Sequence, residues 1–175
     1  MTETRKSATR GSTDLVMVPV ARQIALPTAL LGAMAVAGVV AALVRRPDLS
    51  PWWRIAVAVA LFLLPLAATA WALAPARKLW KSAAAAPMWA TEETGTGTLM
   101  RFKWAIGITV VLIVAGVLTH TMPGLGLAAL GSMAAFAHHL GRALGWQSAN
   151  GRRLFNESAV AANPQVARAY WQPRG

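Results

Sequence analysis

Three long stretches of this sequence contain no charged residue: residues 23–44, 55–76 and 104–141. A helix of about 20 apolar residues crosses the hydrocarbon core of a bilayer. Because lipid offers no hydrogen-bond partners, such a segment must satisfy its backbone polar groups within itself, as a helix does. Only 13% of the residues are charged, against about 25% in soluble domains. The sequence therefore predicts an all-α integral membrane protein.

The number of helices depends on the third stretch. The first two stretches predict one helix each, at about 24–44 and 55–74. The third is 38 residues long, which exceeds one span, and Pro123 followed by Gly124 is a strong turn signal. We therefore expect two short helices there, at 104–119 and 125–140. One tilted helix followed by a re-entrant segment is the alternative.

Charge supports four helices arranged as two transmembrane hairpins, over residues 24–74 and 104–141. Residues 1–23, 75–103 and 142–175 then share one side of the membrane and hold 14 of the 17 Lys and Arg residues. Cytoplasmic segments carry such an excess of positive charge. We expect a cytoplasmic N-terminal segment, a cytoplasmic loop and a cytoplasmic C-terminal tail. Arg outnumbers Lys 13 to 4, which together with abundant Ala is typical of bacterial genes, so the predicted location is the bacterial inner membrane.

The cytoplasmic loop begins with a short amphipathic pattern. On a helix, Arg77, Lys78 and Lys81 share one face, and Leu79 and Trp80 lie largely opposite. This pattern predicts an interfacial helix on the anionic inner leaflet. A simple extension of the second helix is an equal alternative.

The other connecting segments look polar and weakly structured. Residues 94–98 alternate Thr and Gly, which is the composition of a flexible linker. The tail from Gln147 onward is polar with scattered arginines, so we expect a mobile solvated tail rather than a partner-binding one. Residues 158–169 are compatible with a short helix.

Catalytic groups are missing from the predicted helices. None contains Asp or Glu, the usual carriers of protons and cations in membranes, which argues against an ion-coupled carrier and against a Ser–His–Asp triad in the bilayer. The chain has no Cys, so disulfides and thiolate metal sites are excluded. We expect no catalytic residue, no metal site and no enzyme activity.

Three histidines remain as candidate cofactor ligands. His120 lies at the outer end of the third helix, and His138 and His139 lie at the inner end of the fourth. At 1.5 Å of rise per residue, these two ends are roughly 25 Å apart in depth. One haem cannot join them within one chain, so no cofactor is expected. A haem or quinone shared with a partner chain through His138 or His139 is an alternative.

The net charge of +11 does not predict nucleic-acid binding. Most of the basic residues already have a role in orientation and in contact with the lipid bilayer. Gly124 and Gly126 do not form a phosphate-binding loop, because that motif requires a preceding strand. The expected partners are lipids and other membrane subunits.

Small residues recur at every fourth position and predict helix packing. The first helix carries Ala29, Ala33 and Ala37 in a longer row from Ala21 to Ala41. Small residues at this spacing allow close approach of helices in lipid, although an alanine-rich chain produces such rows by chance. The fourth helix has small residues at the same kind of spacing: Gly124, Ala128, Gly131, Ser132 and Ala135.

These features together predict a non-enzymatic, multi-pass inner-membrane subunit or scaffold of a larger assembly. Secretion or conjugation machinery and a respiratory complex are both natural hosts. A homo-oligomeric pore or holin-like protein is the first alternative, although the helices lack a polar stripe. A haem- or quinone-binding membrane anchor is the second alternative.

Overall fold

The computed structural model describes residues 16–45, 52–88, 90–157 and 169–173. Most of these residues are helical. Two helices are long and apolar enough to cross a membrane, α1 (Val20–Arg45) and α2 (Trp52–Lys81). A third span results if α3 (Gly95–Arg101) and α4 (Lys103–Leu118), which meet at a bend of 55°, count as one. The prediction of apolar helices of membrane-spanning length is thereby confirmed for two or three segments.

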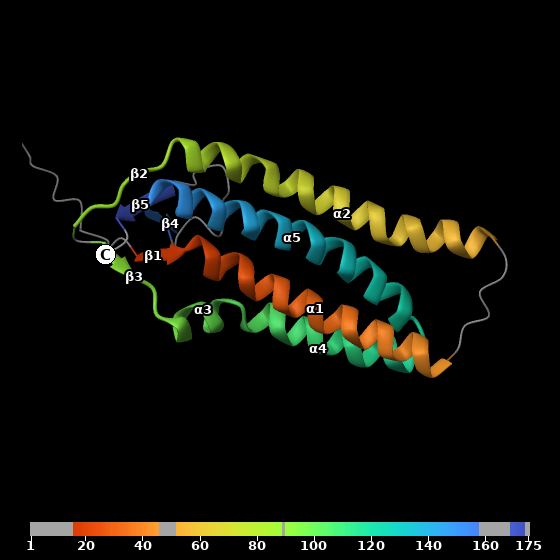
Figure 1. Cartoon of the computed structure of the whole chain (residues 1–175). Helices are drawn as coiled ribbons and strands as arrows, with labels where there is room; N and C mark the ends of the chain where they lie inside the picture. Colours follow the sequence, from red (N-terminus) through yellow and green to blue (C-terminus); the bar gives the residue numbers. More distant parts are fainter. Residues whose placement is uncertain (1–15, 46–51, 89, 158–168, 174–175) are drawn as a thin grey trace, which may run out of the picture.

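The longest of the later helices, α5 (Met122–Asn150), is the centre of the bundle. Helices α1 and α2 pack along α5 on either side, and α4 lies beside α1 and α5 (Figure 1). Hence α1 and α2 make their main contacts with α5 rather than with each other. Helix α5 is not among the segments apolar enough to span by composition alone. Its Gly and Ser residues lower its hydropathy a little, and His138, His139 and Arg142 lower it further.

Two expected helix boundaries differ from the observed ones. Residues 75–81 continue α2, so the amphipathic pattern there belongs to an extension of the second helix and not to a separate interfacial helix. The chain reverses at Thr119–Thr121, ahead of the predicted turn. Pro123 stands in the first turn of α5, where the missing N–H would have no helical partner and the fixed φ favours the helix. The Pro–Gly pair therefore begins a helix instead of interrupting one.

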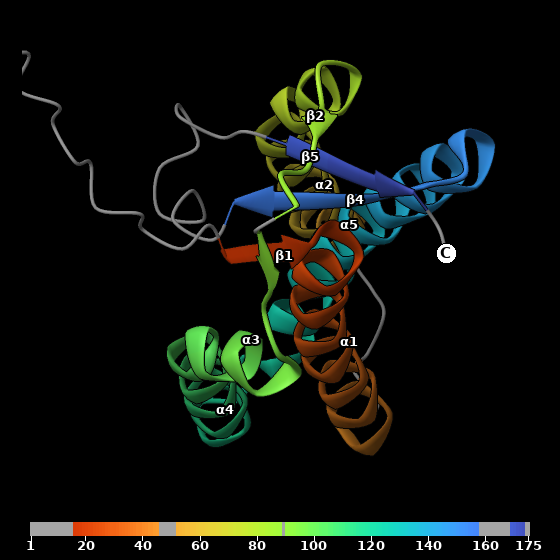
Figure 2. The ribbon, with the colours of Figure 1, turned by 90° about the vertical axis from the view of Figure 1, so that its left-hand side faces the viewer.

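The prediction of an all-α protein is wrong at one end of the bundle, where a five-stranded sheet forms in the order β2-β5-β4-β1-β3. Strands from both ends of the chain and from the loop meet there (Figure 2). The N-terminal segment supplies β1, and the C-terminal tail, which was expected to be mobile, supplies the other two of the three longer strands. The strands are β1 (Val16–Pro19), β2 (Ala84–Ala85), β3 (Thr91–Glu92), β4 (Arg152–Glu157) and β5 (Ala169–Pro173). The short helix expected at 158–169 lies almost wholly outside the described residues.

Strands β4 and β5 form the centre of the sheet. They pair antiparallel, with Leu154 opposite Trp171 and Phe155 opposite Tyr170. Such apolar and aromatic cross-strand pairs stabilise a sheet by up to about 1 kcal/mol each. The guanidinium of Arg152 lies 3.7 Å from the centre of the Trp171 ring, a cation–π contact. The two edge strands have only two residues each, which leaves little open edge for another chain to pair with.

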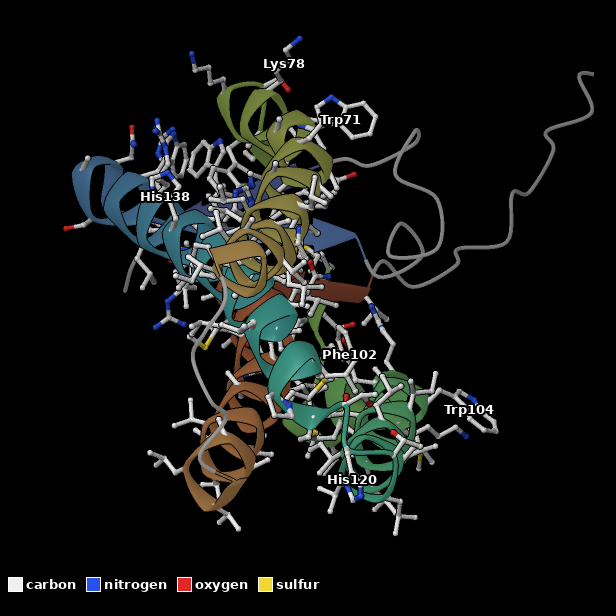
Figure 3. The ribbon with its side chains drawn as sticks, turned by 90° about the vertical axis from the view of Figure 1, so that its right-hand side faces the viewer. Trp71, Lys78, Phe102, Trp104, His120 and His138 are labelled. Atoms are coloured by element: carbon white, nitrogen blue, oxygen red, sulfur yellow. The ribbon has the colours of Figure 1, made fainter. Side chains whose placement is uncertain are left out.

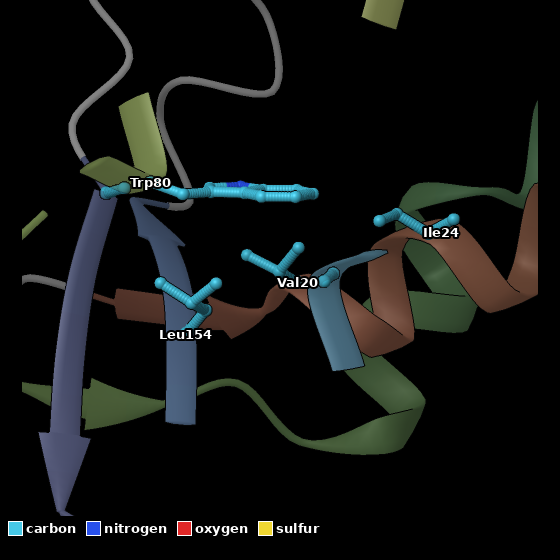
Figure 4. Packing of buried hydrophobic residues seen from close by; sticks show 6 residues of the cluster. Val20, Ile24, Trp80 and Leu154 are labelled. Atoms are coloured by element: carbon cyan, nitrogen blue, oxygen red, sulfur yellow. The ribbon is translucent and has the colours of Figure 1, made fainter. Parts of the chain in front are cut away.

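A shared apolar core joins this sheet to the helices (Figure 4). Val20 and Ile24 of α1 pack there with Trp80 of α2 and Leu154 of β4. Trp80 is 4% exposed and Leu154 is 1% exposed. Ala143 of α5 and Ala169 of β5 complete the cluster. The end of α2 and the sheet are therefore parts of one folded unit.

The Thr–Gly segment expected to be a flexible linker is folded. The side chain of Thr94 caps α3 by accepting a hydrogen bond from the backbone N–H of Gly97. Arg101 forms an ion pair of 2.7 Å with Glu93, and Arg22 of α1 donates to the backbone carbonyl of Glu93 at 2.8 Å. Local capping and these two charged contacts order the loop, which composition alone does not indicate.

Candidate functional site

The backbones of α1 and α5 come very close where the two helices cross. A Cβ atom placed on Gly38 of α1 would lie 2.5 Å from the Cα of Gly126 on α5. A Cβ on Gly126 would lie 3.4 Å from the carbonyl oxygen of Ala35. Helix backbones approach this closely only where side chains are absent or minimal. Met122 of α5 and Met34 of α1 are buried beside the crossing.

The crossing of α5 and α2 uses a different face of α5. A Cβ on Gly131 would overlap the carbonyl oxygen of Phe62 on α2. One residue further along, the hydroxyl of Ser132 accepts a hydrogen bond of 3.2 Å from the hydroxyl of Thr69 on α2. The two crossings hold α5 between its neighbours.

The small residues predicted on α5 lie mainly on the side of α2. Gly131 and Ala135 are buried, and Gly124 and Ala128 are half-buried. A Cβ on Gly124 would make an ordinary contact of 3.5 Å with Leu61 of α2. The structure thus brings Gly124, Gly131 and Ser132 to one helix partner.

The alanines predicted on α1 lie elsewhere. Ala29 and Ala33 are exposed, and only Ala37 is half-buried, beside the cluster of Met34, Met122 and Ala129. The positions that pack on α5 are Ala35 and Gly38, and neither was among the predicted packing residues. Because Gly is rarer than Ala in α1, Gly38 was a better indicator of the contact with α5 than the row of alanines.

An exposed face therefore runs along α1, opposite its contact with α5. The half nearer the sheet consists of Ala25, Ala29 and Ala33, which we call the alanine face. The half farther from the sheet consists of Val36 and Val40, which are 64% and 53% exposed. Within this chain nothing among the described residues covers the alanine face.

The three histidines do not come together. His120 lies in the turn between α4 and α5 with a φ of 66°, and His138 and His139 lie far along α5. His138 is exposed, whereas His139 is buried, and its ring centre is 4.6 Å from that of Trp80. Neighbouring positions on a helix point about 100° apart, which accounts for their different surroundings. Among the described residues, no three His, Asp or Glu side chains form a cluster able to hold a metal.

Basic and aromatic side chains gather near the sheet. Lys78 and Lys81 end α2, Lys103 begins α4, and Arg142 lies on the last part of α5. Figure 3 shows Trp71 and Lys78 projecting from α2, and Trp104 projecting from α4 away from the bundle. Trp71 and Trp104 are 82% and 75% exposed. Exposed tryptophans beside basic residues are typical of the boundary between membrane and water.

Comparison of the chain with protein-family models, with curated proteins and with solved structures finds no match.

Proposed function

We propose that this chain is a non-enzymatic, multi-pass subunit of a larger assembly in the bacterial inner membrane. Four helices, α1, α2, α4 and α5, cross the bilayer, and both termini lie in the cytoplasm. The sheet is then a small cytoplasmic platform attached to the bundle. Secretion or conjugation machinery and a respiratory complex are the candidate hosts.

The position of the sheet supports this topology. The strands flank the helices in sequence, with β1 before α1, β2 after α2, β3 before α3 and β4 after α5. Because all of them meet at one end of the bundle (Figure 1), the chain leaves that end and returns to it twice. Among the described basic residues, Arg22, Lys81 and Arg152 lie at this end, in agreement with the positive-inside rule.

The alanine face is the main observation that supports the proposed role as a subunit. In lipid, apolar side chains of any size are equally well solvated, so helices associate mainly through close packing of small residues. Ala25, Ala29 and Ala33 leave a flat strip on α1 that no part of the described chain uses. A helix of another subunit packing on this strip explains why it is lined by Ala rather than by Leu.

The test compares leucine substitutions on two faces of α1 with a control on α2. Ala33→Leu adds bulk to the alanine face, and Ala67→Leu makes the same change at an exposed position of α2. Each variant is purified in mild detergent, and complex size and co-purifying chains are recorded together with the thermal unfolding of the isolated chain. We expect Ala33→Leu to release the partner subunits without lowering the unfolding temperature, and Ala67→Leu to change neither.

Ala35→Leu serves as the internal comparison. Ala35 is buried, and its carbonyl oxygen lies beside Gly126 of α5, so the substitution should lower the stability of the chain itself by about 1–3 kcal/mol. If Ala33→Leu leaves the complex intact, the alanine face does not bind a subunit. A complex that contains only copies of this chain would instead favour the pore-like alternative, and a haem band in the purified complex would favour the anchor.

A further inference from the structure

A cavity opens between the ends of α2 and α5, close to the sheet. Its volume is about 400 Å³, and it is lined by Trp80 and Lys81 of α2 and by Arg142 and Trp146 of α5. Lys81 and Arg142 are exposed, Trp146 is half-buried, and Trp80 forms the buried wall. The cavity therefore combines two cationic side chains with two indole rings.

The electrostatics of this cavity favour an anion. None of its lining residues is acidic. The ion pairs of the described residues, Arg22 with Glu92 and Arg101 with Glu93, include neither Lys81 nor Arg142. Guanidinium and ammonium groups are the usual protein partners of a phosphate group.

An apolar groove lies on α2, on the stretch of the helix that precedes Trp80. It is lined by Trp71, Ala72, Ala74, Pro75 and Lys78. Ala74, Lys78 and Lys81 follow one another at spacings of four and three, so they share one face of the helix. Lys78 of the groove is therefore one helical turn from Lys81 of the cavity on the same face, and the groove extends from Lys78 towards Trp71.

We propose that the cavity and the groove bind one anionic phospholipid of the cytoplasmic leaflet. Lys81 and Arg142 hold its phosphate, the rings of Trp80 and Trp146 wall the headgroup, and an acyl chain lies along the groove beside Trp71. Basic pockets between transmembrane helices on the cytoplasmic side are suited to such headgroups. This inference rests on the proposed topology, which puts the sheet end of the bundle in the cytoplasm.

A lipid is the ligand, rather than free phosphate, because the site is amphipathic. Two exposed cations attract a free phosphate ion only weakly once salt screens them. A phospholipid binds more strongly because its acyl chain also packs against Trp71 and the alanines of the groove. In the proposed topology, this groove lies at the depth of the bilayer that acyl chains already occupy.

The experiment titrates the purified full-length chain with phosphatidylglycerol or with phosphatidylcholine of the same acyl chains, and counts retained lipids by native mass spectrometry. The variants are Lys81→Gln, Arg142→Gln and the double substitution. Lys103→Gln is the matched control, because Lys103 is exposed and basic near the same end of the bundle but does not line the cavity. We expect preferential binding of one phosphatidylglycerol, weakened about fivefold by each single substitution. The control should bind as the parent does.

Three results would overturn the proposal. The first is equal retention of both lipids by the parent, and the second is loss with Lys103→Gln as large as with Arg142→Gln, which would indicate diffuse attraction. The third is displacement of the lipid by millimolar inorganic phosphate. None of these three results changes the expected effect of Ala33→Leu on the size of the complex. Conversely, loss of partner subunits with Ala33→Leu does not change how much lipid the isolated chain retains. The two proposals therefore fail separately.

Discussion

Gly38 of α1 and Gly126 of α5 lie so close that a methyl group on either would lie within 2.6 Å of the other's Cα. Because α2 meets the opposite part of α5 at Gly131, the central helix has no spare room on two sides. The arrangement of the bundle therefore depends on a few glycines in α1 and α5, and their substitution is the most direct test of it.

Gly126→Ala should lower the free energy of unfolding by about 1–3 kcal/mol, because the added methyl group forces the two backbones apart. Gly145→Ala on the same helix is the control, since no atom lies within 4 Å of a Cβ there, and Ala is the better helix former by up to about 1 kcal/mol. Denaturant titration in mixed micelles measures both. Equal stability of the two variants would show that α1 and α5 do not meet at this point.

The hydroxyl pair of Thr69 and Ser132 should couple α2 to α5 by about 0.6 kcal/mol, the typical value for a hydrogen bond between membrane helices. A double-mutant cycle of Thr69→Val and Ser132→Ala measures this coupling. Thr109 bonds only within its own helix, to the carbonyl of Ala105 at 2.8 Å. Thr109→Val combined with Ser132→Ala should therefore be additive, and a coupling of zero in the first cycle would disprove the contact.

His120 has a φ of 66°, a left-handed conformation that costs most residues about 1–2 kcal/mol and Gly almost nothing. We expect His120→Gly to be more stable than His120→Ala by about 1 kcal/mol. Both variants lose the imidazole, so their difference reports the backbone alone. Thermal unfolding of the two proteins side by side gives the answer, and a more stable alanine variant would mean that the turn has another shape.

Trp80 and Trp71 provide a comparison within α2. Trp80 is 4% exposed in the core that joins the sheet to the helices, whereas Trp71 is 82% exposed. Trp80→Ala should cost about 3–5 kcal/mol, because it leaves a cavity in that core. Trp71→Ala should change stability by less than about 0.5 kcal/mol, as for surface positions in general. Limited proteolysis of the sheet region, followed over time, distinguishes the two variants.

The four-helix topology predicts the side of each connecting segment. Reporter fusions after Ser50 and after Pro123 should lie outside the cytoplasm, and fusions after Gly95 and after Gly175 should lie inside it. The physical reason is the concentration of positive charge in the segments at the sheet end. An external signal at Gly175 would contradict the model, because the sheet joins strands from the beginning and the end of the chain.

Several features follow from the sequence because they depend on local composition. Uncharged apolar stretches of sufficient length form helices whatever they pack against, so α1 and α2 are predictable, although α2 continues to Lys81, beyond its expected end at residue 74. The break near residue 120 is also local, although Pro123 begins the next helix rather than the turn. The crowding of basic residues into three segments is likewise a property of the sequence.

The packing of the helices depends on the tertiary structure. An alanine-rich helix has little contrast between its sides, so the sequence does not reveal that Ala35 and Gly38 face α5 while Ala29 and Ala33 point away. In the same way, only the fold separates buried His139 from exposed His138. Hydropathy varies little around α1, so the direction of packing is decided by which neighbour the whole chain places there.

The sheet is the clearest case of a feature that the sequence alone does not determine. No strand exceeds six residues, too short for apolar alternation to stand out, and the pairs join distant positions such as Met17 with Glu157 and Ala84 with Tyr170. Each strand is stable only because the helix ends bring its partners together and Val20, Trp80 and Leu154 form a core beneath them. Local composition specified the helices, and non-local contacts specified how they pack and what covers their ends.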